Sequence, residues 1–176
     1  MSDAQGNPQQ QPQQAQQQQA TFQIEKVYVK DLSLEIPNAP KVFLEQVQPQ
    51  LEVRIDSAAQ TFAEGYYEVV VTATVTAKIG ERTLFLVEAA QAAIFAVRNV
   101  PAEELDPLLG IACPNVIFPY LRETISDVVV RGGFPPVLLA PLSFEALYMQ
   151  RMQQQQQGQA SGAQGPGGPN IQIARS

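Results

Sequence analysis

The reactive side chains of this chain are few, and their spacing does not build a catalytic group. The one cysteine, Cys113, stands just before a predicted helix, where the helix dipole can lower the pKa of a thiol. A thiol nucleophile needs a general base, however, and the 176 residues contain no histidine. A thiol enzyme acting through Cys113 therefore stays a minor hypothesis beside the more ordinary role of a small buried hydrophobe.

The acidic and glycine-rich motifs are also better explained by local structure than by chemistry. Glu103, Glu104 and Asp106 lack the spacing and the glycine of a calcium loop, and they suit the first turn of a helix. Gly132 and Gly133 do not form a phosphate-binding loop. With no imidazole and no CxxC pair, zinc and disulfide sites are excluded as well. We therefore expect no enzyme, no metal and no cofactor.

Charge and hydropathy exclude further classes of protein. The chain has 17 acidic and 11 basic residues, a net charge of −6, which argues against nucleic acid as a partner. No basic segment followed by an apolar one marks a signal peptide, and the apolar stretches are too short for a membrane span. Together with the unpaired cysteine, these features predict a cytoplasmic protein with no direct membrane insertion.

Both ends of the chain are rich in glutamine and poor in apolar side chains. Residues 1–20 include ten glutamines, and residues 154–176 continue a glutamine run into Gly, Pro, Ala and Ser. Such segments bury too little apolar area to offset the entropy of ordering, so we expect two disordered tails. The folded domain is then predicted to cover residues 21–153.

Four segments of this domain have the alternation of β-strands. They are residues 21–34, 51–56, 67–78 and 83–97. Residues 79–82, with Gly80, supply a turn, so the third and fourth strands are expected to form a long hairpin.

The hydrophobic period then changes to that of helices. A short helix is predicted from Pro101 to a stop at Gly110, and a longer one over residues 114–131, which Pro119 should kink or delay. After a proline-rich loop, Ser143 can cap a last helix. Strands followed by helices predict an α+β fold, a four-stranded antiparallel sheet with the C-terminal helices packed on one face.

The predicted domain also has more apolar surface than this arrangement consumes. Residues 83–97 are apolar on both faces, so that strand needs cover on both faces, which indicates a subunit interface. The loops at 36–43 and 137–142 could line a groove for extended apolar peptide, or could equally pack onto the chain's own core.

Three long motifs resemble those of the SecB protein-export chaperones. They are YVKDLSLEIPNAP at 28–40, GIACPNVIFPYLRE at 110–123 and RGGFPPVLLAPLSFEALY at 131–148. The resemblance extends from about Thr21 to Gln155 and implies a cytoplasmic homotetramer, assembled as a dimer of dimers. Each dimer would form an eight-stranded sheet, and the helices would lie between the two sheets.

The resemblance also implies an activity and the residues that carry it. The family binds unfolded precursors without ATP, keeps them competent for export and delivers them to the SecA motor. By position, an acidic SecA-docking patch corresponds to Asp31, Glu35, Leu86 and Glu88, and the packing between dimers corresponds to Val87, Ala89 and Gln91. The client groove, in which some side chains would be core, corresponds to Phe43, Phe118, Tyr120, Phe134, Leu142, Phe144 and Tyr148.

Two further alternatives remain open at this point. A relative specialised for a toxin–antitoxin–chaperone system would hold an unfolded antitoxin extension instead of secretory precursors. A plain oligomeric scaffold would consume all its apolar surface in self-assembly.

Overall fold

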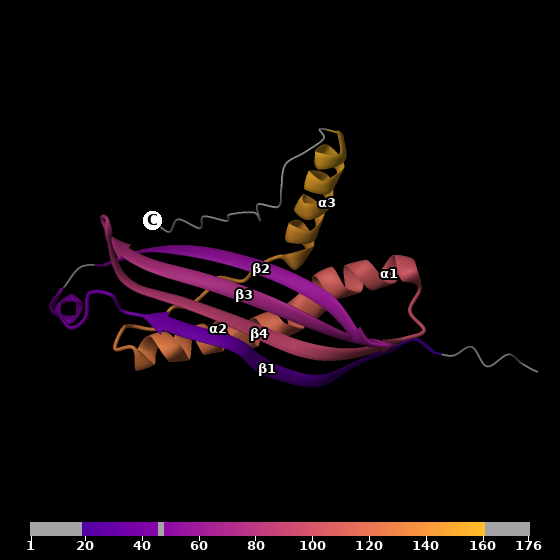
Figure 1. Ribbon diagram of the computed structural model, residues 1–176, viewed down its shortest axis with the longest axis horizontal. Helices are drawn as coiled ribbons and strands as arrows, with labels where there is room; N and C mark the ends of the chain where they lie inside the picture. The colour runs from indigo at the N-terminus through magenta and orange to yellow at the C-terminus, as the bar shows by residue number, and fades with distance from the viewer. Residues whose placement is uncertain (1–18, 46–47, 161–176) are drawn as a thin grey trace, which may run out of the picture.

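The computed structural model describes residues 19–45 and 48–160 and shows one antiparallel sheet of four strands in the spatial order β1-β4-β3-β2 (Figure 1). The strands are β1 (Thr21–Glu35), β2 (Gln50–Ala63), β3 (Tyr66–Ile79) and β4 (Arg82–Arg98). The helices are η1 (Lys41–Leu44), α1 (Ala102–Pro107), η2 (Leu108–Ala112), α2 (Cys113–Arg131) and α3 (Phe144–Ala160). The predicted α+β class and the antiparallel sheet are confirmed.

Tight turns join the last three strands into a meander. Gly80 (φ +57°) lies between β3 and β4, and Gly65 (φ +72°) lies between β2 and β3. Both backbones are in the left-handed region that glycine adopts without a steric cost. The predicted hairpin at residues 79–82 is therefore confirmed.

One face of the sheet is covered by helices, and we call it the inner face. Thr124 of α2 hydrogen-bonds Gln91 of β4, so the odd-numbered residues 85–91 of β4 and their cross-strand partners point inward. The even-numbered residues 86–90 point to the opposite, outer face. Figure 1 shows α2 running along the sheet and α3 projecting away from it.

Helix α2 packs on the inner face through apolar residues spaced four apart. Ile117, Leu121, Ile125 and Val129 are fully buried, the pattern of a helix with one apolar stripe. Beneath them the sheet presents small and β-branched residues that let the helix approach closely: Val71, Ala73, Val75, Val87, Ala89 and Ala93.

The helical region differs from the sequence prediction at Gly110. No stop occurs there, because helical structure continues from Ala102 through the π-helical turn η2 to Arg131. Gly110 instead serves close packing: a β-carbon at this position would lie 2.6 Å from the ring of Tyr148 in α3. The second predicted stop is confirmed, since α2 ends at Arg131 and Gly133 has φ +87°.

Two elements are longer than their sequence signals. β2 continues to Ala63, well past the predicted end at residue 56. α3 begins as predicted, with Ser143 Oγ accepting a hydrogen bond from the Ala146 amide at 3.1 Å, and extends to Ala160. Residues 154–160, predicted as the start of a disordered tail, therefore form the end of α3. Apart from these residues and positions 19 and 20, the predicted tails lie outside the described residues. Among the described residues, no helix is both long and apolar enough to cross a membrane.

Replacing Leu121 tests the packing of α2 on the sheet. We expect Leu121→Ala to lower the free energy of unfolding by about 2–5 kcal/mol, because it removes a fully buried side chain and leaves a cavity. Urea unfolding at one fixed protein concentration measures the change. Glu123→Ala, on the exposed side of the same helix, should stay within about 0.5 kcal/mol of wild type. Equal losses in the two variants would contradict this packing.

Candidate functional site

The four residues of the predicted acidic patch lie together on the outer face. In the β1–β4 register Glu35 is opposite Leu86, and the Asp31–Ala90 pair flanks Glu88 on the same face. The three carboxylates are exposed, and Leu86 is half-buried between them. In the described part of the chain, none of the three forms an ion pair within 4.0 Å. A solvated cluster of this kind attracts a basic partner segment.

The seven predicted groove residues do not form one surface in the single chain. Phe43 of η1 contacts Phe134, with ring centroids 5.3 Å apart, and Phe134 contacts the buried Phe85 at 4.8 Å. Phe43 is 48% exposed and its neighbour Leu44 is 85% exposed. At this end of the sheet, Phe43 and Leu44 therefore expose apolar side chains to solvent, and the rings of Phe134 and Phe85 pack beneath Phe43.

The remaining groove residues lie elsewhere. Phe118 and Phe144 form an edge-to-face pair at 5.5 Å, and both are buried in the core, where α3 joins α2. Leu142 packs half-buried against the same core. Tyr148 is also half-buried and donates a hydrogen bond to Asp106. Tyr120 stands apart on the exposed side of α2.

The residues predicted to pack the dimers together lie under α2 within the same chain. Val87 and Ala89 are fully buried, and Gln91 accepts a hydrogen bond from Thr124 Oγ1 at 3.1 Å. Within the single chain, these three side chains therefore face α2.

A group of exposed apolar residues lies on β1, a strand that the sequence analysis did not single out for its uncovered surface. Most of the apolar residues of β4 are buried within the chain, whereas edge strand β1 carries four that are each more than 40% exposed. They are Phe22, Ile24, Val29 and Leu32, all on the inner face by their pairing with β4. The signal was available in the alternation of residues 21–34, but which strand stays uncovered depends on where α2 lies.

A polar network on the outer face was also missed. The Glu68 carboxylate, largely buried, accepts hydrogen bonds from Lys30 Nζ at 2.6 Å, Gln60 Nε2 at 2.5 Å and the Tyr28 hydroxyl. Donation from Lys30 and Tyr28 lowers the pKa of Glu68, and the bond to Glu68 raises the pKa of Tyr28 to about 12. The network ties β1, β2 and β3 together on a face that no described helix covers.

The structure does not support chemistry at the remaining candidate. Cys113 is fully buried, and desolvation raises the pKa of its thiol to about 12, so it stays protonated at neutral pH. Among the described residues, no group of three or more cysteine, histidine or acidic side chains could hold a metal ion.

The fold and these surfaces define a class: an α+β protein whose four-stranded sheet carries exposed apolar side chains and a separate acidic face. The family model of SecB, described as the preprotein translocase subunit SecB, matches residues 15–155. The chain therefore belongs to the SecB family of protein-export chaperones.

Individual relatives agree with this assignment. Protein-export protein SecB of Chromobacterium violaceum is 63% identical over 133 residues, covering 76% of this chain and 89% of that protein. Its counterpart in Methylobacillus flagellatus is 63% identical over 137 residues, covering 78% and 87%. A SecB-like chaperone of Mycobacterium tuberculosis, in complex with a ChAD peptide from the HigA1 antitoxin, has a TM-score of 0.58 at 18% identity. That likeness covers 69% of this chain and 90% of the other, and it shows the fold alone.

The Glu68 network makes a prediction about pH. Because the pKa of Glu68 is lower in the folded chain than in the unfolded one, its stabilisation is present above the unfolded value of about 4.5 and is lost as pH falls through the folded value. We expect Glu68→Gln to destabilise the fold at pH 7 and the difference from wild type to shrink toward pH 3. Urea unfolding across that range measures it, with Glu123→Gln as an exposed control. A difference independent of pH would contradict the network.

Proposed function

We propose that this chain is an ATP-independent holdase of the cytoplasm that binds unfolded secretory precursors, keeps them competent for translocation and delivers them to the SecA motor. The observation that carries the proposal is the 63% identity to protein-export proteins over most of the chain. The exposed apolar residues of η1 agree with it, since a holdase needs apolar surface that its own fold leaves open.

Holding a client unfolded requires no cofactor. A protein that binds the unfolded state and not the native state shifts the folding equilibrium by mass action alone. Phe43 and Leu44 offer apolar contacts that do not depend on client sequence, and Phe134 supports them from below. Tyr120 is a second exposed aromatic contact. Phe118 and Phe144 serve the client surface indirectly, by fixing α3 against α2.

The acidic patch fits the docking of SecA. Asp31, Glu35 and Glu88 face solvent side by side, and half-buried Leu86 adds an apolar contact among them. Complementary charge steers association and fixes orientation, and it weakens as salt screens the charges.

The two edges of the sheet favour one mode of assembly. β1 is an edge strand with an uncovered apolar inner face, whereas edge strand β2 is held by α3 through Arg151, whose Nη1 donates to the Ser57 carbonyl oxygen at 3.0 Å. Two copies joined along β1 would form an eight-stranded sheet and add cover to Phe22 and Leu32. Two such dimers with the helices between them would give the homotetramer.

Native mass tests the holdase and its assembly together. We expect light scattering of the full chain to give a tetramer that gains the mass of one precursor when the precursor is diluted from urea. A folded precursor should add nothing, because its apolar segments are buried. A tetramer that ignores both forms would contradict the holdase and leave a scaffold or a specialised relative.

Within that assay, Leu44→Ser tests the client surface without disturbing the fold, since Leu44 is 85% exposed. We expect client affinity to fall roughly 3- to 10-fold, because part of the value of burying a leucine is lost. Lys41→Ser on the same short helix is the matched control. Equal affinities for the two variants would remove Leu44 from the client surface.

Glu88→Lys tests the docking patch. We expect SecA affinity to fall roughly tenfold at low salt, with a smaller loss at high salt, because the change reverses one charge of the patch. Client affinity should not change. Glu81→Lys, the same charge change at the β3–β4 turn, serves as the control. An unchanged SecA affinity for Glu88→Lys would count against docking at this face.

A further inference from the structure

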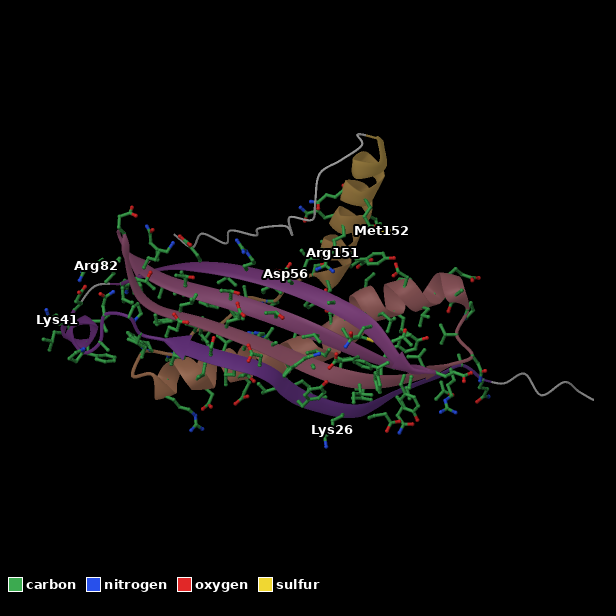
Figure 2. All side chains as sticks on the ribbon, in the orientation of Figure 1. Lys26, Lys41, Asp56, Arg82, Arg151 and Met152 are labelled. Atoms are coloured by element: carbon green, nitrogen blue, oxygen red, sulfur yellow. The ribbon has the colours of Figure 1, made fainter. Side chains whose placement is uncertain are left out.

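The segment that carries Phe43 and Leu44 is fastened on both sides to the start of β4. Before these two residues, Asn38 Nδ2 donates a hydrogen bond to the Thr83 carbonyl oxygen at 2.7 Å. After them, the Arg82 guanidinium binds both carboxylate oxygens of Glu45, with Nη2 2.7 Å from Oε2. Figure 2 shows Arg82 at the same end of the molecule as Lys41 of η1.

The apolar contacts of η1 with the rest of the chain are few. Val42 is 4% exposed and is the one buried residue of η1, while Phe43 rests its ring on Phe134 and Leu44 contributes almost nothing to the core. The Arg82–Glu45 pair fixes the orientation of the segment, because a planar guanidinium forms two hydrogen bonds with a carboxylate in one relative orientation. The two polar contacts thus fix the chain on either side of the exposed pair.

We propose that Arg82, Glu45 and Asn38 form a clasp that positions Phe43 and Leu44 for client binding. The inference rests on the proposed client surface. The clasp acts by preorganisation. Because the two side chains are already ordered before the client binds, the free energy of binding does not include the entropy cost of ordering them. Arg82 and Glu45 are positioning residues, and their effect on the client is transmitted through η1.

The size of the effect follows from the exposure of the pair. The side chain of Arg82 is 58% exposed and that of Glu45 is 20% exposed, so the pair is a partly solvated one. Such pairs stabilise a conformation modestly. We therefore expect roughly a 2- to 5-fold loss of client affinity when the pair is broken, expressed mainly as faster dissociation.

A charge swap in the full-length chain tests the clasp. The client probe is reduced, carboxymethylated α-lactalbumin, which stays unfolded in buffer. Arg82→Glu and Glu45→Arg should each weaken binding roughly 2- to 5-fold, and the double variant should return to within about twofold of wild type. Lys41→Glu and Glu81→Arg make the same two charge changes beside the clasp and should not weaken binding comparably. Rescue by the double variant is a readout that a simple loss of charge would not give.

The outcomes separate this inference from the holdase itself. If wild type binds the probe and the single variants bind equally well, or if the double variant fails to recover, the clasp is overturned and the holdase stands. If wild type does not bind the probe, the holdase fails and the clasp with it. Should urea unfolding show that the charge reversals disturb the fold, Arg82→Gln carries the test with the same 2- to 5-fold expectation, and wild-type affinity in that variant overturns the clasp.

Discussion

The width of one helix against a four-stranded sheet is the constraint on which the rest of this structure depends. A helix with its side chains is about 10 Å across, and strands are about 4.8 Å apart, so one helix covers roughly two strands. Here α2 lies over β3 and β4, where the inner-face residues are fully buried. The inner face of β1 is left with Phe22, Ile24, Val29 and Leu32 partly in water. A sheet built this way has unfinished apolar surface, and a partner chain is the direct way to complete it.

The outer face of the sheet is not covered by any described helix, so most of its side chains are in contact with water and must be polar. Threonines alternate along β3. Glu68, the one buried carboxylate in the described part of the chain, forms an ion pair with Lys30 and accepts hydrogen bonds from Tyr28 and Gln60. Holding Lys30 on Glu68 leaves Asp31, Glu35 and Glu88 without a paired cation among the described residues. Lys30, the neighbour of Asp31 in the sequence, is thus paired with Glu68 of β3 and not with the patch.

Local signals in the sequence were sufficient where structure is decided locally. Gly80 marks the hairpin, Ser143 caps α3 and Gly133 ends α2, each through backbone geometry that neighbouring residues set. The acidic patch was predicted from the family resemblance, and the β1–β4 register brings its residues together on one face. The role of Gly110 was not predictable in this way. Its lack of a side chain leaves room for the ring of Tyr148, which is 38 positions later in the chain. The full length of β2 was missed because residues 57–60 are small or polar and form a strand by pairing with β3.

For the candidate client residues as well, contacts between distant parts of the sequence were not predictable from local patterns. Aromatic identity could not separate Phe43, which stays exposed, from Phe118 and Phe144, which pair in the core, because burial is decided by where α3 meets α2. That division has a functional consequence under the proposed role. Phe43 packs through Phe134 onto the inner-face residue Phe85, whereas the carboxylates of the patch are on the outer face, so a client bound at Phe43 need not cover the acidic patch. A chaperone that passes its client directly to a motor must hold both partners at once, and a sheet that is covered on one face and charged on the other provides two separate places to do so.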